Sequence, residues 1–182
     1  MISRINRTRR ASGAFTLIEL LIVVAIIGML VSLTAPAIEN AREGAESAKC
    51  LTNLRNIGVA VISYVADNDN RFPIIETDPS NPVYDPSEEA GTLLSVLGEY
   101  GVTEQGLRCP TDRRTFDNFK KRGSSYEWRP MLDGELASSP VIFTRRGLRY
   151  PPSSKILLVM DFEPVHRGRP NLLFADGRVR TK

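Results

Sequence analysis

The chain has 182 residues, a formal net charge of +3 and one long apolar run near its start. Its length suits one compact domain with an appendage. The positive charge belongs to residues 1–14, which carry four arginines and no acidic residue. The whole chain has 24 basic and 21 acidic side chains, so the part after residue 14 has 20 basic and 21 acidic ones. The body of the protein is therefore close to neutral, which argues against a nucleic-acid-binding role.

The apolar run predicts a helix that crosses a membrane. Residues 20–38 contain no charged side chain. As a helix, residues 15–35 would be about 31 Å long at about 1.5 Å per residue, which matches a hydrocarbon core of roughly 30 Å. The preceding arginines predict a cytoplasmic N-terminus, with the rest of the chain outside. An ordinary secretory signal, cut near Ala35, is the competing interpretation.

Glu19 argues against an ordinary signal or anchor. A carboxylate costs free energy to bring into lipid unless it has a partner there. The stretch that contains it, Ala14-Phe-Thr-Leu-Ile-Glu19-Leu-Leu-Ile-Val-Val-Ala-Ile-Ile-Gly28, resembles the processing and assembly signal of type IV prepilins and type II secretion pseudopilins. The resemblance implies that a prepilin peptidase removes the basic leader and methylates the new N-terminal amine.

The position of the cut is open between two bonds. In the family, the cut follows glycine and the acid is the fifth residue after it. A cut between Gly13 and Ala14 would make Glu19 the sixth residue, whereas a cut between Ala14 and Phe15 would make it the fifth. We favour the second, which also makes phenylalanine the first residue of the mature chain.

Cleavage before Phe15 would give Glu19 a partner. The new amine is protonated at neutral pH. In a staggered array of parallel helices, Glu19 of one subunit would meet the Phe15 amine of its neighbour and set the register. The alternative is an uncleaved anchor whose Glu19 reaches the membrane interface.

The amphipathic pattern continues beyond the apolar run. We expect Pro36 to bend or locally open the helix. Small and apolar residues then recur at three- and four-residue steps as far as Val65, and they become larger from Leu51 onward. The turn-forming residues 67–70 should end the helix. We therefore expect a leader over 1–14, a helix over 15–66 that spans the membrane to about residue 36, and an exported head over 67–182.

The head is predicted to be α+β, with a small antiparallel sheet that packs on the long helix. We expect a helix over 87–100, capped by Ser87, and an irregular segment over 110–135 whose aromatic side chains pack into the core. Strand patterns lie at 141–144, 155–160, 171–175 and 178–181, and the last two flank a hairpin turn at Asp176-Gly177.

Several segments beyond the membrane resemble a large bacterial group of pseudopilin-like proteins. They are 50–58, which begins with Cys50, then Tyr64, Asp67-Asn68, Phe72-Pro73, Cys109-Pro110, and His166 followed ten residues later by Asp176-Gly177. An exported head permits disulfides, so Cys50 and Cys109 are either bridged or two buried thiols.

His166 suggests no catalytic metal centre. A catalytic zinc site usually needs three nitrogen- or sulfur-rich ligands, so we expect a structural histidine that orients the hairpin at the sheet edge. Related secretion pseudopilins bind calcium near the C-terminal sheet, which makes Asp161, Glu163 and Asp176 candidate calcium ligands. No other cofactor is expected.

The resemblance implies a structural subunit of a type II secretion pseudopilus or a related filament, and not an enzyme. Its expected partners are a prepilin peptidase, other pilin or pseudopilin subunits, an inner-membrane assembly platform and membrane lipid. It would cross the bacterial inner membrane once, with its head in the periplasm or in an extracytoplasmic filament. The alternatives are a type IV pilin or minor pilin, which serves adhesion, motility or DNA uptake, and an uncleaved membrane-tethered binding protein or enzyme.

Overall fold

The computed structural model describes residues 15–76, 91–144, 147–164, 166 and 168–182. It divides into two compact units, with the boundary between Ala41 and Arg42. The predicted leader, 1–14, and the predicted cap Ser87 lie outside the described residues.

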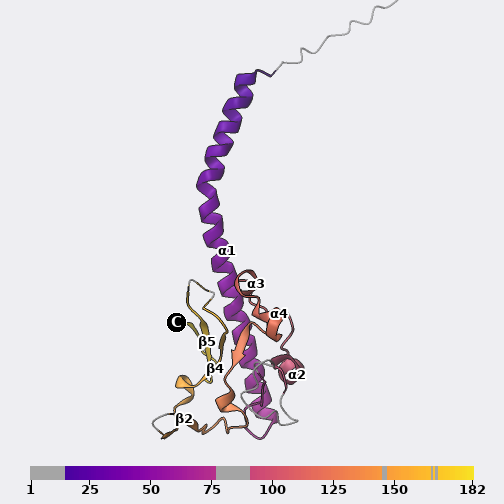
Figure 1. Ribbon diagram of the computed structural model, residues 1–182, viewed down its shortest axis with the longest axis vertical. Helices are drawn as coiled ribbons and strands as arrows, with labels where there is room; N and C mark the ends of the chain where they lie inside the picture. The colour runs from indigo at the N-terminus through magenta and orange to yellow at the C-terminus, as the bar shows by residue number, and fades with distance from the viewer. Residues whose placement is uncertain (1–14, 77–90, 145–146, 165, 167) are drawn as a thin grey trace, which may run out of the picture. The chain divides into compact units, whose positions relative to one another are not determined.

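Helix α1, Leu17–Asp67, contains the apolar run (Figure 1). It is the one helix among the described residues that is long and apolar enough to cross a membrane. All side chains over 15–41 are exposed, as expected of a segment whose apolar surface has no core to pack on. Pro36 lies inside α1 without ending it, so the expected local opening does not interrupt the helix.

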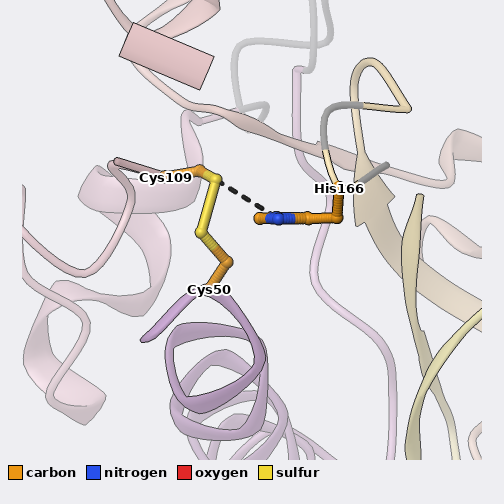
Figure 2. A group of neighbouring side chains, drawn as sticks. All are labelled: Cys50, Cys109 and His166. Carbon is orange, nitrogen blue, oxygen red and sulfur yellow. Dashed lines mark hydrogen bonds between the residues drawn. A yellow bond between two sulfur atoms is a disulfide. The ribbon is translucent and has the colours of Figure 1, made fainter. Parts of the chain in front are cut away.

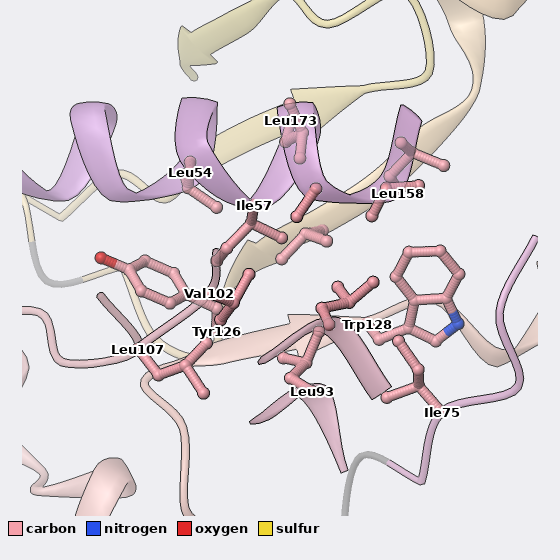
Figure 3. Packing of buried hydrophobic residues seen from close by; sticks show 14 of the residues in the cluster. Leu54, Ile57, Ile75, Leu93, Val102, Leu107, Tyr126, Trp128, Leu158 and Leu173 are labelled. Atoms are coloured by element: carbon pink, nitrogen blue, oxygen red, sulfur yellow. The ribbon is translucent and has the colours of Figure 1, made fainter. Parts of the chain in front are cut away.

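In the second unit, the later turns of α1 supply one wall of the core. The buried side chains of this part include Leu54, Ile57 and Val61, which follow the three- and four-residue spacing of one helix face. Figure 3 shows Leu54 and Ile57 pointing from α1 toward the head, where Tyr126 and Trp128 lie fully buried. The two aromatic side chains thus belong to the core, as predicted for this segment.

The other wall is a four-stranded antiparallel sheet. Its strands are β1 (Tyr126–Trp128), β4 (Leu157–Asp161), β5 (Asn171–Phe174) and β6 (Val179–Thr181), in the order β1-β4-β5-β6. Asp176 and Gly177 lie in the turn between β5 and β6, where the amide of Gly177 donates to the carbonyl of Phe174 at 2.9 Å. The predicted α+β class, with a long helix on a small antiparallel sheet, is confirmed.

Smaller elements complete the head. A separate hairpin joins β2 (Ile142–Thr144) and β3 (Gly147–Arg149). Short helices lie at α2 (Leu93–Leu97), α3 (Asp112–Thr115) and α4 (Asn118–Arg122), and single 3-10 turns at 98–100, 130–132 and 153–155. The prediction of an irregular segment over 110–135 was wrong for α3, α4 and β1, of which β1 pairs with β4.

The start of the predicted helix at 87–100 was also wrong. Gly91 forms a parallel bridge with Ile75, which holds the chain extended just before the helix. Thr92 is the N-cap, and its hydroxyl accepts a hydrogen bond from the amide of Ser95 at 3.1 Å. At the other end, Gly101 adopts a left-handed conformation with φ of 94°, which ends the helical segment where the sequence predicts.

Candidate functional site

The first turn of α1 is closed by Thr16 and Glu19. The amide of Glu19 donates to the hydroxyl of Thr16 at 3.3 Å, and Oε2 of Glu19 accepts from the amide and the hydroxyl of Thr16 at 2.9 and 2.8 Å. This reciprocal arrangement is a capping box, which satisfies donors that the helix start leaves without partners. The spacing Thr-x-x-Glu is a sequence signal for such a box, in addition to the assembly role predicted for Glu19.

The capping box holds the Glu19 carboxylate at the very start of the helix. Both bonds that the carboxylate accepts use Oε2, and Oε1 has no hydrogen-bond partner among the described residues. Oε1 is therefore left available for a further donor. Gly13 and Ala14 lie outside the described residues, so the position of the cut stays a prediction.

Cys50 and Cys109 are joined by a disulfide, with their Cα atoms 5.3 Å apart. Cys50 lies on the inward face of α1, and Cys109 on the segment before α3. Both side chains are buried. The bridge therefore ties the long helix to a segment 59 residues further along the chain. From the sequence alone, a bridge and two buried thiols were both open for this pair.

Asp112 and Ser125 hold the segment that carries Cys109. The hydroxyl of Ser125 accepts from the amide of Cys109 at 3.1 Å and donates to Asp112 Oδ2 at 2.7 Å. Asp112 is buried and also accepts from Asn118 Nδ2 at 2.8 Å. A buried carboxylate needs such donors because it has lost its hydration. No pattern in the sequence pointed to Asp112.

Asn53 joins the same segment to α1. Its side-chain amide donates to the carbonyl of Arg108 at 3.0 Å and to the hydroxyl of Tyr126 at 3.1 Å. Burial raises the pKa of the Tyr126 hydroxyl well above its usual range. Polar groups buried in this way specify one alignment of helix and segment, because any other alignment would leave them without partners.

His166 lies beside the disulfide (Figure 2). Its Nε2 is 3.4 Å from Cys109 Sγ and 3.7 Å from Asp161 Oδ2. His166 and Arg169 exchange backbone hydrogen bonds at 3.3 and 3.0 Å. These contacts fix the connection between β4 and β5 rather than the hairpin after β5. Burial lowers the pKa of His166, against the opposing charges of Glu43 and Glu46, so the ring is neutral at neutral pH.

The three carboxylates named for calcium do not gather within the described part of the chain. The one described group of three metal-ligating residues consists of Cys50, Cys109 and His166. Asp161 is buried at the end of β4, where it accepts from the amide of Asn171 at 2.7 Å, and burial raises its pKa to about 7. Asp176 lies beyond the far end of β5. Calcium binding by Asp161, Glu163 or Asp176 therefore stays a prediction.

Comparisons with known proteins find similarity both in the N-terminal segment and over a longer part of the chain. Residues 9–35 match the family model of the prokaryotic N-terminal methylation motif. The chain is 28% identical over 120 residues to type II secretion system core protein G of Vibrio cholerae, a match that covers 63% of this chain and 82% of that protein. It is 38% identical over 68 residues to the core protein G of Aeromonas hydrophila, covering 37% and 46% of the two chains.

A third relative is the core protein G of Pectobacterium carotovorum, 36% identical over 62 residues, which are 34% of this chain and 39% of that protein. The matches to the second and third relatives thus span less than half of those proteins. No solved structure matches the chain significantly.

All three relatives are core proteins of a type II secretion system, in agreement with the expectation that the chain is not an enzyme. Together with these relatives, the methylation motif, the apolar N-terminal helix and the α+β head support a pseudopilin-like protein.

Proposed function

We propose that the chain is a structural subunit of a type II secretion pseudopilus or a related filament, cut by a prepilin peptidase between Ala14 and Phe15. The observation that carries the proposal is the joint presence of the methylation motif over 9–35 and a membrane-length helix whose first turn holds Glu19. The uncut chain would cross the inner membrane once, with its head in the periplasm.

The capping box suggests how the cut prepares the helix for assembly. Cleavage creates a charged amine at Phe15, next to the carboxylate that Thr16 holds in place. A charge pair inside lipid is stable only when its partners are held in good geometry. Glu19 would then use Oε1 for the amine of a neighbouring subunit, while Oε2 keeps the capping bonds to Thr16.

The exposed apolar side chains of α1 would supply the packing between subunits. Large apolar side chains that are more than half exposed recur from Leu17 to Ile38. In the membrane they face lipid, and in a filament they would face the same segment of other subunits. Transfer from lipid to filament costs little because both surroundings are apolar. The Glu19 pair would therefore decide the register.

The cleavage is tested by the intact mass and N-terminal sequence of the protein extracted from membranes with and without the prepilin peptidase. We expect a peptidase-dependent start at N-methylated Phe15. A start at Ala14 would keep the processing but place Glu19 sixth. An intact Met1 would support a tethered protein, and a cut near Ala35 would support a secreted one.

Assembly is tested by cross-linking of subunits in cells that contain the secretion machine. Glu19→Leu should insert in the membrane at the normal level but lose filament incorporation. Ser32→Ala is the matched control, because it also removes a polar group from the apolar run, one whose hydroxyl donates to the carbonyl of Met29 in its own helix at 2.8 Å. Normal incorporation of Glu19→Leu would contradict the proposed pairing. Incorporation into surface pili alone would indicate a type IV pilin or minor pilin.

A further inference from the structure

Three metal-ligating side chains meet in the interior of the head. Cys50, Cys109 and His166 are all buried, and their ligand atoms lie within 4.8 Å of one another. They come from α1, from the segment before α3 and from the connection between β4 and β5, as Figure 2 shows. The chain has two cysteines and one histidine, so every strongly zinc-binding side chain it contains is in this cluster.

We propose that this cluster is an exchangeable site, which forms the disulfide when oxidised and binds one Zn²⁺ through Cys50, Cys109 and His166 when reduced. A two-electron reductant such as a dithiol gives two electrons and two protons to the disulfide and becomes oxidised itself. The protein then holds two thiols, and both lose their protons when Zn²⁺ binds as the metal takes thiolate ligands. The proposal does not depend on filament assembly.

The spacing of the cluster suits a tetrahedral ion. With Zn–S near 2.3 Å and Zn–N near 2.0–2.1 Å, neighbouring sulfur and nitrogen ligands lie about 3.6 Å apart. The distance from Cys109 Sγ to His166 Nε2 is already 3.4 Å. Two sulfur ligands would lie about 3.8 Å apart, so the cysteine side chains must separate once the S–S bond is broken. Small χ rotations of the two cysteines would achieve this.

His166 is held in a state that can bind a metal. Its backbone is held by the hydrogen bonds that it exchanges with the backbone of Arg169, and Nε2 lies 3.4 Å from Cys109 Sγ. Nδ1 is buried and has no hydrogen-bond partner among the described residues. Asp161 Oδ2 lies 3.7 Å from Nε2, so the fourth position is open to this carboxylate or to water.

A cavity lies on the His166 side of the cluster. His166 lines this cavity of about 550 Å³ together with Glu43, Ser47 and Arg169. An ion would have to reach the cluster from there by displacing the side chain of His166, which is itself buried. The cavity also supplies a matched control, since Arg169→Ala removes a lining side chain that cannot ligate Zn²⁺ and leaves the backbone bonds to His166 in place.

The test is a Co²⁺ titration of the full chain in detergent, reduced with a phosphine under nitrogen. One Co²⁺ per chain should give thiolate-to-cobalt charge transfer and the visible bands of tetrahedral Co²⁺, and Zn²⁺ should displace it. The oxidised chain and the double variant Cys50→Ser, Cys109→Ser should show neither band. His166→Ala should bind more weakly by about 100-fold, whereas Arg169→Ala should bind like the parent chain.

Near-ultraviolet circular dichroism separates a missing site from an unfolded head. A reduced chain that keeps its signal but shows no cobalt bands would overturn the proposal. So would His166→Ala with unchanged affinity, because the third ligand would then be another group. If reduction abolishes the dichroism signal, Zn²⁺ should restore it in the parent chain but not in His166→Ala. No recovery in the parent chain, or equal recovery in His166→Ala, would also overturn the proposal.

Discussion

Gly58 of α1 lies directly against Leu173 of β5. A Cβ atom at position 58 would meet Leu173 Cδ1 at 2.9 Å and Cδ2 at 3.4 Å. Leu173 is fully buried, so its side chain has little room to move aside in a close-packed interior. The absent side chain at position 58 therefore sets how closely the helix and the sheet approach.

This contact predicts opposite effects for two alanine substitutions in one helix. A Cβ at Gly44 would meet no atom within 4 Å, so Gly44→Ala should stabilise the head by about 0.5–1 kcal/mol through helix propensity. Gly58→Ala should lose that gain to the contact with Leu173, and Gly58→Val should destabilise by about 1–3 kcal/mol. Urea unfolding followed by the fluorescence of Trp128 would measure this. Equal stabilisation by both alanines would contradict it.

Removal of the disulfide should lower the stability of the head strongly. Cys50 and Cys109 are separated by 59 residues, and closing such a loop in the unfolded chain corresponds to about 4 kcal/mol in the chain-entropy model. We expect the double variant Cys50→Ala, Cys109→Ala to lose about that much free energy of unfolding in urea. Adding a reductant should shift the parent chain toward the variant and leave the variant unchanged. A loss below about 1 kcal/mol would show that other contacts already align α1 with the segment before α3.

Asp133 should make stability depend on pH. Burial raises its pKa to about 6, although Trp128 Nε1 donates to its Oδ1 at 2.6 Å. Because the folded state binds the proton more tightly than the unfolded state, the stability from this group is present below about pH 4 and is lost as the pH rises through 6. Asp133→Asn keeps an acceptor for Trp128 but cannot ionise.

The variant should therefore match the parent chain near pH 4 and exceed it at pH 8. Since Asp133 is only half-buried and solvent screens its charge, we expect a gain of about 1 kcal/mol. Thermal unfolding of both proteins across this range is the measurement. If the difference in stability between the two proteins stays the same from pH 4 to pH 8, Asp133 does not have the raised pKa that we assign to it.

Loss of the Thr16 cap should loosen the first turn of α1. Thr16→Val removes the hydroxyl that accepts from the amide of Glu19, and a lost cap costs about 1 kcal/mol. Amides of residues 17–20 should then exchange about 5-fold faster in detergent, while Thr16→Ser should behave like the parent chain. Thr34→Val is the control, because its hydroxyl bonds to the carbonyl of Val31 within the helix and caps nothing. Equal rates in all variants would contradict a capping role.

Much of the architecture follows from local sequence patterns. The uncharged run and the stripe that ends at Val65 determine one helix, observed as Leu17–Asp67, because backbone hydrogen bonding and side-chain period act within a few residues. The turn at Asp176-Gly177 and the strands beside it, β5 and β6, follow from the same kind of local rule. The signal around Glu19 is equally local, and it led to the pseudopilin resemblance without any knowledge of the head.

The tertiary structure decided which distant residues meet. Tyr126–Trp128 is too short and irregular a stretch to be identified as a strand, and it becomes β1 because β4 offers it hydrogen bonds. The cap at Thr92 depends on the bridge between Ile75 and Gly91. The cluster of Cys50, Cys109 and His166 joins positions from three parts of the chain. Spacing along a sequence carries no information on such contacts, because the packing of helix against sheet sets the distances between them.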